Sequence, residues 1–230
     1  MGRLFDLDSP IMNFLSKLAD VIWLNVLTVV CSIPVFTVGA SMTALHYVML
    51  KIVRNEESYI TRSFFKSFKQ NFKQATIIWL ILLLGLVILV GDLLILKYSG
   101  MAFPDWLQTV LLAATIFFLF AVMHVFPVLS KFENSVINTY KNSLFMGILS
   151  LPKTIIMMFC WAIPAVVVIY LPQAFPLVLG LGISGPAFLC ALLYNKTFKR
   201  FEPEEESCED WTVEKQEKEG ETEKGIEFDQ

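Results

Sequence analysis

The stretch "CSIPVFTVGASMTALHYVMLK", residues 31–51, decides how often this chain crosses a membrane. A long apolar run ends at Pro34, a group of small and hydroxyl-bearing residues follows, and then the sequence becomes apolar again. Proline ends a helix because its ring clashes with the preceding turn and its nitrogen carries no hydrogen. Gly39 can adopt the backbone conformations that a tight turn requires. We therefore predict that "IPVFTVGAS" is a turn between two helices.

The helix after this turn should run from about Val38 to Arg54, with Ser41 or Thr43 capping its start. About 16 residues at 1.5 Å each cover roughly 24 Å, less than the ~30 Å of a bilayer core. Such a short helix needs local thinning of the bilayer, burial against neighbouring helices or a partly re-entrant path.

Five apolar runs are each close to the ~20 residues that cross a bilayer as a helix. Lipid offers no hydrogen-bond partners, so the backbone of each run must satisfy itself as a helix. We predict an all-α fold, a polytopic bundle of transmembrane helices. The runs are Leu18–Val38, Ala75–Leu96, Trp106–Leu129, Thr154–Tyr170 and Phe175–Tyr194.

The positions of lysine and arginine predict the orientation, since cytoplasmic loops are rich in both. Residues 51–73, 130–153 and 196–200 are rich in bases, whereas "KYSGMAFPD" and "LPQAFP" hold one lysine between them. If the chain turns after Pro34, the base-rich segments all lie in the cytoplasm and the base-poor loops lie outside. The chain then has six spans, or a helical hairpin plus four spans, and both of its ends are in the cytoplasm. If it does not turn, there are five spans and the N-terminus is outside. We favour six, because five would place Arg3 and Lys17 on the wrong face.

Two cytoplasmic segments have the pattern of amphipathic helices. In "SYITRSFFKSFKQNFKQ", residues 58–74, phenylalanines recur at helical spacing and Lys66, Lys69 and Lys73 fall on the other side. This pattern predicts a helix at the membrane surface that runs directly into the next span, with the lysines near lipid headgroups. "NSVINTYKNSLFMGILSLPK", residues 134–153, has a similar pattern.

Charge divides the 230 residues into two parts. The chain is 56% hydrophobic and 17% charged, with a net charge of −3. Residues 202–230 contain thirteen acids and three lysines, whereas the other 201 residues contain 8 acids and 15 bases. We expect a membrane domain over residues 1–200 and an acidic, disordered cytoplasmic tail over 201–230. The start of the chain lacks the pattern of a removable signal peptide.

The sequence shows no recognisable catalytic motif, so we expect no enzymatic activity and no cofactor. His46 and His124 are the two histidines, and neither has a nearby carboxylate that would indicate a metal site. Four cysteines are widely spaced, three in apolar runs and one in the tail, which indicates isolated thiols.

A few polar residues lie in or near the spans and are candidates for function, because burying an ionisable group in lipid is costly. Asp20 and Asp92 lie near the ends of their runs and could reach the headgroup region. Asn25 lies deeper and is most simply a hydrogen-bonding contact between helices. The small-residue run "GLGISGPAF", residues 180–188, permits either tight packing or a kink that lines a substrate path.

The first 85 residues closely resemble the YesL-like family of small bacterial integral membrane proteins. The resemblance rests on "PVFTVGASMTALHY", residues 34–47, and "SFFKSFKQNFKQA", residues 63–75. It implies a bacterial, Gram-positive origin and genes near sugar ABC importers and two-component regulators. The family has no settled activity, and the acidic tail departs from it. Its characteristic positions correspond here to Pro34, Thr37, Gly39, Ala40, Ser41, Thr43 and Tyr47.

Two functions of different class follow. The first is a non-enzymatic accessory or regulatory protein of carbohydrate uptake in the cell membrane, with an ABC transporter permease or a sensor kinase as partner and no nucleic acid. The second is a small-solute or sugar transporter. Against the second, few polar residues lie in the spans, and each hydroxyl of a sugar needs a hydrogen-bond partner.

Overall fold

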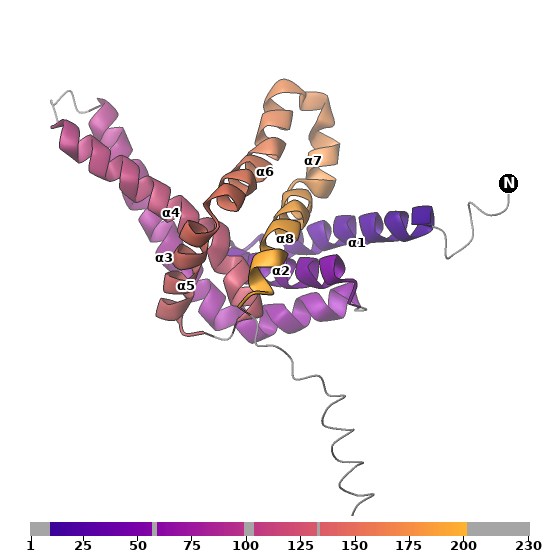
Figure 1. The fold of residues 1–230 in the computed structure, drawn as a ribbon. Helices are drawn as coiled ribbons and strands as arrows, with labels where there is room; N and C mark the ends of the chain where they lie inside the picture. The colour runs from indigo at the N-terminus through magenta and orange to yellow at the C-terminus, as the bar shows by residue number, and fades with distance from the viewer. Residues whose placement is uncertain (1–9, 57–58, 99–103, 133, 202–230) are drawn as a thin grey trace, which may run out of the picture. The chain divides into compact units, whose positions relative to one another are not determined.

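The computed structural model describes residues 10–56, 59–98, 104–132 and 134–201, and in this part the chain is all-α, as predicted. Figure 1 shows the helices in chain order. The chain divides into two compact units, Met1–Asn195 and Lys196–Gln230. The predicted acidic tail lies almost wholly outside the described residues. The helices are α1 (Pro10–Cys31), α2 (Val38–Arg54), α3 (Ile60–Tyr98), α4 (Asp105–Lys131), α5 (Val136–Leu149), α6 (Leu151–Tyr170), α7 (Phe175–Leu181) and α8 (Ser184–Phe198), with short 3₁₀ helices at Val35–Thr37 and Pro172–Ala174.

Within the described part of the chain, four stretches of helix are long and apolar enough to cross a membrane, or five if the bent pair α7–α8 forms one span. The four are Val35–Arg54, α3, α4 and α6. Helix α1 is not among them, although its 22 residues meet the length of a span. The number of spans therefore stays a prediction.

Helix α2 is the centre of the packing, and its bounds agree with those predicted from the sequence. In the most apolar 18-residue stretch of Val35–Arg54, 67% is buried inside the protein, whereas the corresponding buried share is 11% in α3 and 17% in α4. Helices α1, α3 and α4 all contact α2. Burial against neighbouring helices was one of the predicted ways to accommodate so short a helix, and this burial is observed. An apolar cluster joins α2, α3 and α4 and consists of Ala40, Ala75, Ile78, Leu82, Val125, Phe126 and Leu129.

The turn before α2 is shorter than predicted. Helix α1 ends at Cys31 and a 3₁₀ turn at Val35–Thr37 leads directly into α2. The Thr37 hydroxyl shares its one proton between the carbonyl oxygens of Cys31 and Pro34, both 2.6 Å away, and so pairs a backbone group left free where α1 ends. From α3, the Trp79 indole donates to the Val35 carbonyl at 2.8 Å. This turn is therefore held by its own hydroxyl and by a neighbouring helix.

Gly39, Ala40 and Ser41, which the predicted turn included, lie inside α2, as do two other characteristic positions, Thr43 and Tyr47. The prediction that Ser41 or Thr43 caps this helix is wrong. Their hydroxyls donate to the carbonyls of Thr37 and Gly39 one helical turn earlier, because serine and threonine inside a helix bond back to the preceding turn.

Gly39 is also not required for an unusual backbone conformation, since it is helical. A Cβ atom at Gly39 would lie 2.7 Å from the Trp79 Cβ and would collide with the Ala75 carbonyl oxygen. The glycine therefore allows close contact between the backbones of α2 and α3.

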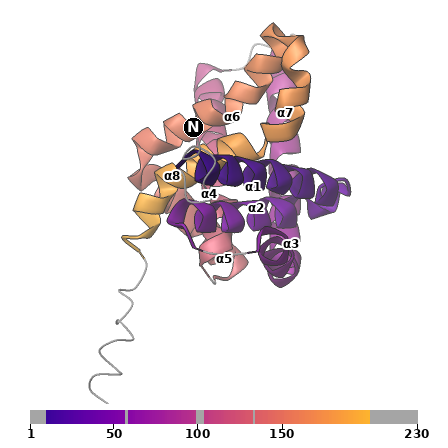
Figure 2. The same ribbon diagram turned by 90° about the vertical axis from the view of Figure 1, so that its right-hand side faces the viewer.

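The predicted surface helix and the span after it form one continuous helix, α3. Figures 1 and 2 show it bending between the part beside α2 and the part that pairs with α4. Phe64 is fully buried, and Phe68 and Phe72 pack against the apolar cluster that joins α2, α3 and α4, whereas Phe65 is exposed. Lys66, Lys69 and Lys73 are also exposed. Three of the four phenylalanines thus contact protein, and their amphipathic pattern does not require a lipid surface.

Helix α5 begins with the Ser135 side chain accepting from the Asn138 N–H, as an N-cap does. Tyr140 on α5 donates to the Ile78 carbonyl on α3 at 2.8 Å, and burial raises the pKa of Tyr140 to about 12. On the other side of α5, Ile137, Phe145 and Ile148 are exposed.

Candidate functional site

The last apolar run is a broken helix rather than a straight span. The segments Pro172–Leu181 and Ser184–Phe198 meet at 54°. Gly182 lies between them, where a Cβ atom would be 2.9 Å from the Val178 Cγ1 and closer still to its carbonyl oxygen. The kink allowed by the run "GLGISGPAF" is therefore present. A break of this kind leaves backbone N–H and C=O groups without helical partners.

Asn25 of α1 supplies those partners. Its side-chain amide donates to the Leu179 carbonyl of α7 at 2.7 Å, and its oxygen accepts from the N–H groups of Ile183 and Ser184 at 3.1 and 3.0 Å. Asn25 is almost fully buried, with 1% of its surface exposed. One side chain thus pairs backbone groups on both sides of the break. The simplest prediction for Asn25 was a hydrogen-bonding contact between helices. Its bonds join α1 to both sides of the break between α7 and α8.

Two further polar contacts join α8 to the central helix α2. The His46 ring lies edge-on to the Tyr194 ring, and its Nδ1 is 3.2 Å from the Tyr194 hydroxyl. About two helical turns further along α2, the Arg54 guanidinium donates to the side-chain oxygen of Asn195 at 2.9 Å. Neither residue was predicted from the sequence, since Tyr194 is the last residue of an apolar run and Asn195 directly follows that run.

Of the other predicted polar residues, His124 lies close enough to His46 to interact with it electrostatically, whereas Asp20 and Asp92 lie elsewhere. His124 of α4 is buried and its Nδ1 lies 3.3 Å from the Phe120 carbonyl, one helical turn away. Asp20 of α1 is half-buried and lines a shallow hollow with Trp23, whose indole donates to the Thr61 hydroxyl at 3.0 Å. Asp92 is half-buried near the end of α3. Among the described residues, no three histidine, cysteine, aspartate or glutamate side chains are arranged to hold a metal ion.

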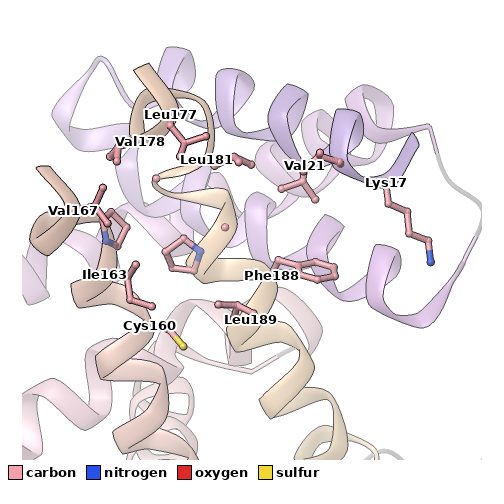
Figure 3. A pocket seen from close by; sticks show the side chains of 15 residues that line it. Lys17, Val21, Cys160, Ile163, Val167, Leu177, Val178, Leu181, Phe188 and Leu189 are labelled. Carbon is pink, nitrogen blue, oxygen red and sulfur yellow. The ribbon is translucent and has the colours of Figure 1, made fainter. Parts of the chain in front are cut away.

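Next to the break lies a cavity of about 470 Å³ between α1, α6, α7 and α8. Figure 3 shows apolar side chains from all four helices around it, with Lys17 at one end. Pro164 inside α6 and Pro186 inside α8 belong to its wall, together with Gly182 and Gly185. Nothing in the sequence predicted this cavity, because the part of its wall that comes from α1 lies more than 100 residues before the other three helices in the chain.

Comparison with known proteins finds a partial match. Residues 21–93 match a family model described as "Protein of unknown function, DUF624", which covers the second half of α1, the turn, all of α2 and most of α3. No curated protein and no solved structure matches. The N-terminal third of this chain is therefore similar to an uncharacterised protein family.

Proposed function

We propose that this chain is a non-enzymatic integral protein of the bacterial cell membrane that acts as an accessory or regulatory component of carbohydrate uptake. The link to carbohydrate rests on the resemblance to the YesL-like family. Its partner would be the permease of a sugar ABC transporter or a two-component sensor kinase.

The observation that favours an accessory role is how the polar groups inside the bundle are used. Asn25, His46 and Thr37 all make hydrogen bonds within the chain. The cavity beside the break between α7 and α8 is walled by hydrocarbon, with Lys17 at its end. A sugar would bury several hydroxyls, and each one without a partner costs about 1–3 kcal/mol. A site of this composition is unsuited to a sugar.

The alternative, a small-solute transporter or permease subunit, is favoured by the break between α7 and α8. Broken helices in transporters present free backbone groups to the substrate. Here Asn25 already occupies the freed groups of Leu179, Ile183 and Ser184. A transporter of this design would have to release Asn25 before it could bind substrate.

For the membrane arrangement, we propose six spans formed by α1, α2, α3, α4, α6 and the pair α7–α8, with both ends in the cytoplasm. Helix α5 and the first part of α3 would lie at the cytoplasmic surface. The exposed apolar residues of α5 would face lipid. Lys66, Lys69 and Lys73 would each contribute about 1 kcal/mol of attraction to anionic lipid.

This arrangement predicts the result of cysteine labelling in intact cells. In a chain whose other cysteines are replaced, a single cysteine at Ser9→Cys or the native Cys208 should react with a membrane-impermeant maleimide only after the cells are opened. Both positions lie outside the described residues. Labelling at position 9 alone from outside would support five spans, and labelling at both positions from outside would invert the orientation.

The accessory role is tested by crosslinking from the exposed face of α3. A photoreactive amino acid at Val87, which is 60% exposed, should form adducts with a sugar permease or a sensor kinase in the native membrane. The same amino acid at Ile78, which is fully buried, serves as the control and should give none. The purified chain in proteoliposomes should not take up sugar. Uptake without any partner would overturn the accessory role in favour of the transporter.

A further inference from the structure

We propose that the cavity between α1, α6, α7 and α8 binds one acyl chain of an anionic phospholipid, with the Lys17 ammonium contacting its headgroup. This inference goes beyond the proposed function and does not depend on it. It rests on the composition of the cavity wall, on the reason the cavity is open, and on the charge at one end of it.

The wall is hydrocarbon contributed by four helices. Val21 comes from α1, Ile163 and Val167 from α6, Leu177 and Leu181 from α7, and Leu189 from α8. Figure 3 shows the aliphatic side chains of Ile163, Val167 and Leu181 around the same space. Its volume of about 470 Å³ lies within the usual range of ligand sites, roughly 300–1,000 Å³. Water is a poor occupant of such a cavity, because a buried water needs two to four polar partners.

The cavity is open because of the residues that the sequence places at the break. Proline inside α6 and α8 and glycine at 182 and 185 remove bulk from the wall. At Gly185 the nearest neighbour of an added Cβ atom would be the Leu181 Cβ, 3.9 Å away. A larger side chain at 185 therefore meets open space and would occupy the cavity.

The occupant should come from the bilayer. Helix α6 and the pair α7–α8 are among the stretches apolar enough to cross a membrane, so the cavity lies among segments that contact lipid chains. A helix of a second copy is ~10 Å across with its side chains and needs a groove several turns long. A cavity of about 470 Å³ is too small for it but suits a flexible chain.

The charge at the end of the cavity selects the headgroup. Lys17 lies at one end of the lining side chains in Figure 3, and it is exposed. Its ammonium donates to the side-chain oxygen of Asn55, which is a neutral amide that positions the charge without neutralising it. An ammonium has three donors, so others are available for a phosphate oxygen. Asp20, three residues along α1, lines a different hollow with Trp23 and Thr61.

The test is native mass spectrometry of the full chain in mild detergent, titrated with phosphatidylglycerol or phosphatidylcholine. The wild type should bind one phosphatidylglycerol per chain in preference to phosphatidylcholine. Gly185→Leu should reduce binding of both lipids about tenfold or more, because the leucine fills the cavity. Gly180→Leu is the matched control. It lies on α7 outside the cavity wall, an added Cβ meets nothing within 4 Å, and binding should be unchanged.

A second variant distinguishes the contribution of the lipid headgroup to binding from that of the acyl chain. Lys17→Gln should lower the affinity for phosphatidylglycerol about fivefold, to the level of phosphatidylcholine, and leave phosphatidylcholine unaffected. If Gly185→Leu does not fold, Val167→Phe narrows the same cavity from α6 and should also reduce binding. The proposal is overturned if the filled variants bind lipid as the wild type does, if Lys17→Gln keeps the preference, or if Gly185→Leu instead abolishes a dimer.

Discussion

Gly39→Val should destabilise the folded protein by about 3 kcal/mol or more, the upper end of what overpacking costs. The valine Cβ alone would lie 2.7 Å from the Trp79 Cβ and would collide with the Ala75 backbone oxygen. Backbone cannot move aside as the end of a flexible side chain can, so α2 and α3 would have to separate. Because α2 is more buried than α3, α4 and α6, moving it away from α3 would also disrupt its contacts with α1 and α4. The measurement is thermal unfolding in mild detergent.

Two controls distinguish this collision from general effects of valine. Gly91→Val makes the same change inside α3, where an added Cβ meets nothing within 4 Å, and should change stability little. Val38→Ile adds one methyl group beside Gly39 at a half-buried position and should also be nearly silent. An unchanged melt for Gly39→Val would mean that the two helices are not in this close contact.

Asn25→Leu should have the second largest effect, about 1–3 kcal/mol. Leucine has a similar size, so packing is kept while three hydrogen bonds at the break are lost. The N–H groups of Ile183 and Ser184 and the carbonyl of Leu179 would then be left without the partner that Asn25 provides. Hydrogen exchange should therefore speed up at residues 183 and 184, and the melting temperature should fall.

Asn138→Leu provides the comparison, because the Asn138 side chain is exposed on α5 and the change should be silent. If Asn25→Leu melts like the wild type and exchange at the break is unchanged, the break does not depend on Asn25. The transporter alternative would then gain, since the freed backbone groups would be available to a substrate.

Much of the fold could be predicted from local patterns. The bounds of α2 follow from Pro34 and from the return of the apolar pattern, and they agree with the structure. The all-α class follows from the lengths of the apolar runs, because an apolar segment of about 20 residues has no other stable form in lipid. The run around Gly182 allowed either tight packing or a kink, and a break is found there. These features depend on residues that are near one another in sequence.

Contacts between distant residues decided the rest. Asn25 could be recognised as a polar residue in a span, but its partner at Leu179 is 154 positions away. The phenylalanines of α3 have a pattern that suits lipid and protein equally, and only the position of α2 shows that they pack on protein. Gly39 suggested a turn, since a glycine needed for close packing and one needed for conformation look the same in a sequence. Local patterns in the sequence thus determined where helices form and break. Only the tertiary structure decided which helix faces meet, because packing brings together segments that are distant in sequence and whose local patterns do not specify their partners.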